Sequence, residues 1–125
     1  RHRVTFLPFM KQDRLMEVLD DQDLLCHACD FEGLGKIIVE AMTRGLPVLV
    51  SDVSPLNSYI QDGINGFLVS NTPEEWAARI LELSRDNERL IRVSRVAMET
   101  ALAEWSADSN VISYEEYFRE VLARS

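Results

Sequence analysis

Few residues in this sequence mark a secreted, membrane-spanning or nucleic-acid-binding protein. Cysteine occurs twice, and no apolar run approaches the roughly 18 residues that a membrane span needs. The 13 basic residues are outnumbered by 21 acidic ones, so the net charge is −8. Because nucleic acids and anionic membranes bind basic faces, we expect no nucleic-acid partner, and we leave any peripheral membrane contact to other parts of a longer protein.

The two cysteines, Cys26 and Cys29, have the Cys-x-x-Cys spacing of redox and metal sites. We expect neither chemistry, because no second cysteine pair follows and the only histidine besides His27 is His2. Cys26 falls inside an apolar segment and is expected to be a small core residue. Two unbridged thiols suit a reducing compartment, so the sequence predicts a cytoplasmic protein with no metal and no cofactor.

The chain has 125 residues and begins with Arg1 rather than methionine. This length allows one domain that buries about two thirds of its unfolded surface. We therefore expect one domain, or part of one, that belongs to a longer protein.

Strand-like and helix-like patterns alternate along most of the chain. The strands are expected over residues 3–7, 24–27, 46–50 and 67–69. The helices are expected over residues 12–19, 35–44, 56–60, 73–84, 87–104 and 109–122. This alternation predicts an α/β fold, a Rossmann-like parallel sheet with flanking helices, and ligands bound off the carboxyl ends of the strands.

Capping residues and apolar periodicity refine these helices. Thr72 is expected to cap the helix that starts at Pro73, with Glu75 completing a capping box, and Ser54 to cap the helix over 56–60. The helix over 87–104 should bury an apolar face that includes Leu102. Three aromatic residues at helical spacing and one tryptophan are expected to be packing residues: Tyr114, Tyr117, Phe118 and Trp105.

The segment from Glu32 to Glu40 carries the strongest functional signal, because two carboxylates flank a glycine loop and a helix start. If the helix begins near Gly35, Glu40 lies about 7–8 Å along its axis. A phosphate over the amides of Leu34, Gly35 and Lys36 would then have one carboxylate on each side. Carboxylates accept hydrogen bonds from hydroxyl groups, so this layout predicts a ligand with hydroxyls at both ends and phosphates between, as in a nucleotide sugar.

Each of these residues also has a purely structural interpretation. Glu40 could pair with Lys36 or Arg44 four residues away, and Glu32 could be an acid favoured by the helix dipole. Lys36 could be solvated, and His27 could be an ordinary strand-end residue. By the same reasoning, Asp52 could be a turn former, and the acidic run over 20–23 is expected to be a solvated loop.

Three stretches carry a resemblance to a known family: Phe31–Gly35, Glu40–Met42 and Gly45–Val48. Together they resemble the Glu-Gly-Phe-Gly, Glu-Ala-Met and Gly-x-Pro-Val signature of family GT4, the group 1 retaining glycosyltransferases. The likeness continues over nearly the whole chain, through the segment 62–69 and the helix start at Pro73.

The resemblance implies a GT-B enzyme, of which this chain is the C-terminal half-domain of the donor-binding lobe with a helical C-terminal end. It implies that residues 1–105 belong to that lobe and that residues 106–125 form a helix packed on it or toward the absent N-terminal lobe. In this family the first glutamate, here Glu32, faces the donor sugar as the catalytic residue, and the second, here Glu40, binds the ribose. The loop amides, here Gly33, Leu34, Gly35 and Lys36, approach the sugar and the distal phosphate.

The reaction implied is metal-independent, retaining transfer from a UDP- or GDP-sugar to a glycan or lipid-linked acceptor, as in polysaccharide biosynthesis at the inner face of the membrane. We expect the isolated chain to be inactive, because the acceptor lobe and the phosphate-binding basic residues of the family lie outside it. Two alternatives remain open: a non-catalytic binding module of the same fold, and a receiver-like protein, which the position of the acidic run disfavours.

Overall fold

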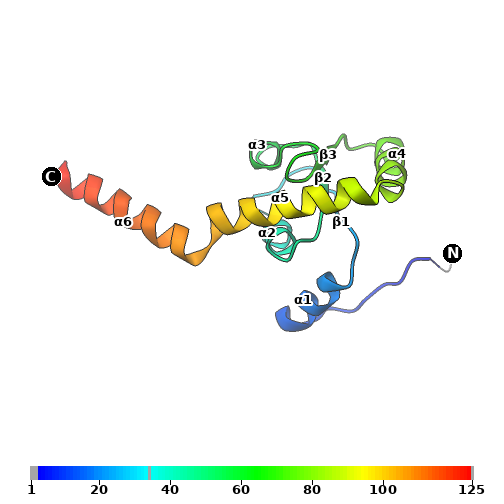
Figure 1. Ribbon diagram of the computed structural model, residues 1–125, viewed down its shortest axis with the longest axis horizontal. Coiled ribbons are helices and arrows are strands. Elements are labelled where there is room, and N and C mark those ends of the chain that lie inside the picture. The colour runs from blue at the N-terminus through cyan, green and yellow to red at the C-terminus, as the bar shows by residue number, and fades with distance from the viewer. Residues whose placement is uncertain (1–2, 34, 125) are drawn as a thin grey trace.

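The computed structural model describes residues 3–33 and 35–124, and their side chains except those of 107–113. Within this part of the chain, three parallel strands form a sheet in the order β1 (Leu25–His27), β2 (Val48–Ser51) and β3 (Phe67–Val69). The helices are α1 (Gln12–Asp20), α2 (Lys36–Thr43), α3 (Leu56–Tyr59), α4 (Pro73–Ser84), α5 (Asn87–Trp105) and α6 (Ala107–Ala123). The expected α/β fold with a parallel sheet is therefore confirmed (Figure 1).

The central strand β2 is buried on both faces and organises the core. Val48 and Val50 pack into one apolar cluster with α2 and the later part of α5, whereas Leu49 packs into a second cluster with β3, α4 and the start of α5. This alternation follows from the two-residue period of a strand, and it leaves no solvent-exposed face on β2. Apolar packing on both faces of the sheet therefore fixes the strand ends, where the candidate site lies.

Most of the expected helices are confirmed to within a residue or two. Thr72 caps α4 as expected, because its side chain accepts a hydrogen bond from the Glu75 amide at 3.2 Å. The expected Ser54 cap of α3 is wrong. The amides at the start of that helix donate to the backbone carbonyls of Val53 and Pro55 instead, so no side-chain cap is needed.

The expected strand over residues 3–7 is wrong, because these residues are irregular in the structure. Within the described residues β1 is the end strand of the sheet, and the segment does not pair with it. Phe6 is 93% exposed, so the apolar side chains of this segment are not buried in the structure. Cys26 is also exposed rather than buried, because side chains alternate along β1 and only Leu25 and His27 face the packed side.

The C-terminal helices depart from the expected packing. The buried face of α5 consists of Val93, Ala97 and Ala101, spaced four residues apart, and Leu102 lies on the exposed side. Small residues on this face let α5 pack closely on α2. Trp105 packs against the core as expected, but the aromatic side chains of α6 are exposed, and that helix extends from the end of α5 away from the sheet (Figure 1).

Candidate functional site

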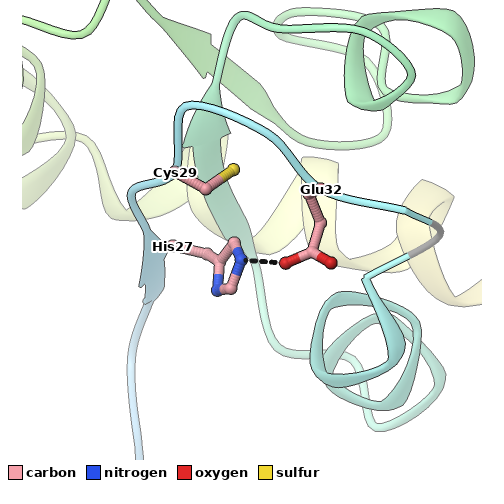
Figure 2. A group of neighbouring side chains, drawn as sticks. All are labelled: His27, Cys29 and Glu32. Atoms are coloured by element: carbon pink, nitrogen blue, oxygen red, sulfur yellow. Dashed lines mark hydrogen bonds and ion pairs between the residues drawn. The ribbon is translucent and has the colours of Figure 1, made fainter.

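The end of β1 and the loop after it bring a histidine and a glutamate together. His27 is the last residue of β1, and its Nε2 lies 2.9 Å from Oε2 of Glu32. The other carboxylate oxygen of Glu32 accepts a hydrogen bond from the Gly33 amide at 3.0 Å. His27 is thus a satisfied strand-end residue, as one interpretation of the sequence held, and it fixes the orientation of Glu32 (Figure 2).

A hydrogen-bond network fixes the loop between these two residues. The Cys29 amide donates to Oγ of Ser51 at 2.9 Å, and that hydroxyl donates to Oδ1 of Asn71 at 2.6 Å. The Asn71 side-chain amide donates back to the Cys29 carbonyl at 2.6 Å. Ser51 ends β2, and Asn71 follows β3, so residues from three strand ends hold this loop in place. The sequence interpretation did not place Ser51 or Asn71 in the site, although Ser51 ends β2 and Asn71 comes two residues after the end of β3.

The start of α2 offers backbone amides without a side-chain cap. Gly35 occupies the N-cap position in the left-handed region, with φ of 70°, and its carbonyl accepts bonds from the Ile38 and Val39 amides. The first amides of a helix have no carbonyl partner within the helix, and glycine has no side chain to accept from them. The expected role of the loop amides is therefore sterically available at Gly35 and Lys36, while Leu34 lies outside the described residues.

Glu40, on the next turn of α2, is held by side chains rather than by the loop. Its Oε1 accepts a hydrogen bond from Gln12 of α1 and lies 3.7 Å from Nζ of Lys36. The structural pairing of Glu40 with Lys36 is therefore present, although Lys36 itself is 84% exposed. The alternative pairing with Arg44 is wrong, because Arg44 forms an ion pair with Asp20 at the end of α1.

The pair between Arg44 and Asp20 corrects the expectation that the whole acidic run over 20–23 is a solvated loop. The hydrogen bond from Arg44 holds the pKa of the Asp20 carboxyl below its usual value. Asp52, by contrast, accepts a bond from the Asn57 side chain at 3.0 Å, which fits a turn-forming role.

Tyr59 joins the site from α3, and the sequence gave no signal for it. An ideal Cβ built on Gly35 would lie 3.4 Å from the Tyr59 hydroxyl, so this hydroxyl lies beside the start of α2. The ring packs edge-on against Trp105 with centroids 5.4 Å apart. Burial raises the pKa of Tyr59 to about 12, and the electrostatic effect of the nearby Glu32 and Cys29 side chains adds to this rise.

His27, Cys29 and Glu32 also form a group of three different metal-binding side chains. One donor atom from each lies within 4.8 Å of the others, and all three side chains are partly buried (Figure 2). The thiol of Cys29 is held in its neutral form, because burial raises its pKa and the carboxylates of Glu32 and Asp30 add to that effect against a hydrogen bond from Ser51. The sequence interpretation considered Cys29 only as the partner of Cys26, and so missed this arrangement.

Comparison with known proteins gives consistent results. A family model described as "Glycosyl transferases group 1" matches residues 1–100. A D-inositol 3-phosphate glycosyltransferase of Nocardia farcinica is 36% identical over 100 residues, which make up 79% of this chain and 22% of that protein. The chain thus spans about a fifth of the length of this relative, and 26% of the length of the corresponding protein of Rhodococcus jostii, which is 33% identical over 116 residues.

Solved structures share the fold at lower sequence identity. The sucrose-phosphate synthase of Thermosynechococcus elongatus superimposes with a TM-score of 0.87 at 22% identity, over 99% of this chain and 31% of that one. The HepE protein of Anabaena, solved in complex with UDP and glucose, has a TM-score of 0.73 at 24% identity, over 87% of this chain and 29% of that one. These likenesses confirm the expected fold class, a GT-B α/β sheet with flanking helices and a helical C-terminal end. None of the helices in the described part of the chain has both the length and the apolar composition of a membrane span.

Proposed function

Because the chain belongs to the group 1 glycosyl transferase family, we propose that it forms the donor-binding segment of an enzyme that transfers a sugar from a nucleotide sugar. The observation that carries this proposal is the start of α2. Its uncapped amides follow a left-handed glycine at the carboxyl ends of the strands, with Glu32 before them and Glu40 after them. This is where α/β sheets bind ligands and where anions meet helix N-termini.

Each residue then has a defined role in binding the donor. Glu32, oriented by His27, accepts hydrogen bonds from hydroxyls of the donor sugar, and Glu40 accepts them from the ribose. The amides of residues 33–36, with Lys36 nearby, approach the sugar and the distal phosphate. Leu34 belongs to this set by the family resemblance alone.

Donor binding in this way requires that two hydrogen bonds within the chain be replaced. The Gly33 amide now donates to Glu32, and Glu40 now accepts from Gln12. Donor hydroxyls and phosphate oxygens can replace these partners one for one, so no buried polar group is left without a bond. The site therefore holds its carboxylates in position with contacts that a ligand can take over.

The chemistry follows from where charge develops. As the bond between sugar and diphosphate breaks, negative charge grows on the departing diphosphate, and the positive end of the α2 dipole and its amides stabilise that charge. Glu32 acts as the catalytic residue by contacting the donor sugar. The family resemblance supports transfer with retention of configuration and without a metal ion.

The comparisons support one class of donor and suggest a further class of acceptor. The likeness to an Anabaena protein that was solved with UDP and glucose supports a UDP-sugar as donor. The relatives named for D-inositol 3-phosphate support a small polyol phosphate as an acceptor, beside the glycan or lipid-linked acceptors of polysaccharide biosynthesis. The acceptor is bound by a lobe outside this chain.

The remaining regions fit this arrangement. We assign residues 1–105 to the donor lobe and residues 106–125 to a helix that packs toward the acceptor lobe, in keeping with the exposed apolar side chains of α6. The free thiols of Cys26 and Cys29 are in keeping with a reducing, cytoplasmic location.

Hydrogen exchange with UDP-glucose tests the proposed site. We expect the ligand to slow exchange at the amides of residues 33–36, and we expect Glu40→Gln and Glu32→Gln to reduce that protection. Glu99→Gln is the matched control, since Glu99 is an exposed acid in the middle of α5. The isolated chain should show no turnover with radiolabelled UDP- or GDP-sugars.

Protection that is absent at saturating UDP-glucose and UDP would contradict donor binding at α2. Protection that is equal in all three variants would contradict the roles of the two glutamates. Protection in a full-length protein that shows no sugar transfer would favour the alternative, a non-catalytic binding module of the same fold.

A further inference from the structure

We propose that His27, Cys29 and Glu32 form a binding site for a soft divalent cation, best fitted by Zn²⁺, and that this cation competes with the donor for Glu32. The first part stands on the geometry of the three side chains. The second part rests on the proposed function, because it requires Glu32 to contact the donor sugar.

The distances between the three donor atoms suit a tetrahedral ion. In such a site, zinc lies about 2.3 Å from sulfur and about 2.0–2.2 Å from nitrogen and oxygen, which places the donors roughly 3.4–3.6 Å apart. Here Nε2 of His27 lies 2.9 Å from the Glu32 carboxylate, and all three donors lie within 4.8 Å of one another. Changes of about an ångström in side-chain position therefore bring all three to coordination distance of one ion.

The charges and donor types favour zinc over other common cations. A thiolate and a carboxylate balance the charge of a divalent ion, and the imidazole adds a neutral nitrogen ligand. A donor set of one nitrogen, one sulfur and one oxygen is typical of zinc, whereas Mg²⁺ and Ca²⁺ prefer oxygen ligands alone. When the ion binds, the Cys29 thiol gives its proton to solvent, and the fourth coordination position is left for water.

Two hydrogen bonds fix the backbone of Cys29, which is the second of the three proposed ligands along the chain. The amide of Cys29 is bonded to Ser51, and its carbonyl is bonded to Asn71. His27 is fixed by its place in β1, which pairs with β2. Preorganised ligands lose little conformational entropy on binding, so the site needs no refolding to hold an ion.

Zinc binding changes what Glu32 can do. A carboxylate oxygen that coordinates zinc is no longer free to accept a hydrogen bond from the donor sugar. The ion also occupies space at the end of the loop and so excludes the sugar sterically. The same three residues would thus make the donor site sensitive to zinc, as an inhibitor rather than a cofactor of the transfer.

Titration of the 125-residue chain with Co²⁺ tests the site directly. Cobalt in place of zinc gives a near-ultraviolet absorption band when a thiolate coordinates it. We expect this band in the wild-type chain and in Cys26→Ser, and no band in Cys29→Ser. Cys26 is the matched control because it is an exposed cysteine three residues away and outside the group.

Calorimetry with Zn²⁺ gives the affinity. We expect Cys29→Ser and His27→Ala each to weaken binding by at least about tenfold, the lower end of what losing even an outer partner of a metal site costs. Far-ultraviolet circular dichroism checks that each variant is folded. A band that survives in Cys29→Ser, or zinc affinity unchanged in that variant, would overturn the metal site.

Competition is measured by the UDP-glucose protection of residues 33–36 with and without Zn²⁺. Zinc should reduce protection in the wild-type chain and not in Cys29→Ser, a comparison that removes any effect of zinc bound to the diphosphate itself. Protection that is unaffected by saturating zinc would overturn the competition. If UDP-glucose gives no protection even without zinc, the proposed function fails, while the cobalt spectrum still decides the metal site.

Discussion

Gly35 and Gly33 lie on the same loop but differ in what their backbones require. Gly35 has φ of 70°, and an added Cβ would lie 2.7 Å from Cδ1 of Ile38. Gly33 has no atom within 4 Å of an added Cβ. Only Gly35 therefore depends on the absence of a side chain, although both belong to the family signature.

We expect Gly35→Ala to lower the free energy of unfolding by about 1–2 kcal/mol, the usual cost of a left-handed conformation for a residue with a Cβ. Gly33→Ala should change it by less than about 0.5 kcal/mol, as is usual for exposed positions. Urea unfolding of both variants measures the difference. Equal values for the two would show that the left-handed start of α2 is not needed for stability.

The raised pKa of Tyr59 predicts a loss of stability at high pH. Burial, assisted by the electrostatic effect of the nearby Glu32 and Cys29 side chains, raises the pKa of Tyr59 to about 12 in the folded chain, from 10.0 for an isolated tyrosine. The unfolded chain therefore loses this proton first. The stabilising contribution is complete below pH 10 and is lost as the pH rises toward about 12.

Denaturant unfolding at a series of pH values measures this effect. We expect the free energy of unfolding to fall between about pH 10 and about pH 12, and to fall less steeply in Tyr59→Phe. Identical slopes in the two proteins would contradict a partly buried, neutral Tyr59 beside Glu32.

At the scale of single residues, the sequence predicted the parts of the site that lie close together in the chain. Spacing together with the family signature pointed to Glu32, Gly35 and Glu40, and their roles in donor binding stay a prediction. Ser51, Asn71 and Tyr59 are not, because each reaches the site from a different element, and only the packing of the sheet brings them to the loop. Local spacing carries no information on such contacts.

Whole elements were predictable where local signals and packing agree. The strand over 67–69 and the capped helix from Pro73 match the structure, because turn residues and a Thr cap define their ends. The prediction of a strand over residues 3–7 was wrong, because an apolar segment forms a stable strand only when another strand pairs with it. The predicted burial of Leu102 was wrong because α5 packs through Ala97 and Ala101. A prediction from apolar periodicity gives leucine more weight than alanine.

Two side-chain contacts connect α1 to α2. Arg44 at the end of α2 pairs with Asp20 at the end of α1, and Gln12 of α1 donates to Glu40. Leu19 is the fully buried residue of α1, and Met16 packs against the same apolar cluster while partly buried. With so little buried surface, these polar contacts have a large share in holding α1 in place.

We therefore expect Arg44→Gln to speed hydrogen exchange at the amides of α1 without changing exchange in β2. Arg14→Gln is the matched control, because Arg14 pairs with Glu17 inside the same helix and does not connect α1 to α2. Hydrogen exchange with mass spectrometry measures both variants. An equal effect of the two would show that α1 is held by its apolar contact alone.

At the scale of the whole molecule, α6 is set apart from the two apolar clusters. The buried members of these clusters lie between Leu19 and Ala101, and α6 contacts chiefly α5. Its described apolar side chains are well exposed: Tyr114, Tyr117, Phe118, Val121 and Leu122. A helix with these properties is typical of a surface that packs on another body.

Removing α6 should therefore separate stability from association. We expect a chain that ends at Ser106 to unfold at nearly the same urea concentration as the full chain, because Trp105 and both apolar clusters remain. We also expect the full chain, and not the shortened one, to self-associate with rising concentration in sedimentation velocity. The reason is that water-exposed aromatic side chains of α6 favour contact with a second copy when no other lobe covers them. Glu116→Ser in the full chain is the control, since it alters the same helix and should leave association in place. Self-association that persists without α6 would assign the contact surface to other exposed apolar residues, such as Phe6 and Phe9, and would contradict the role given to this helix.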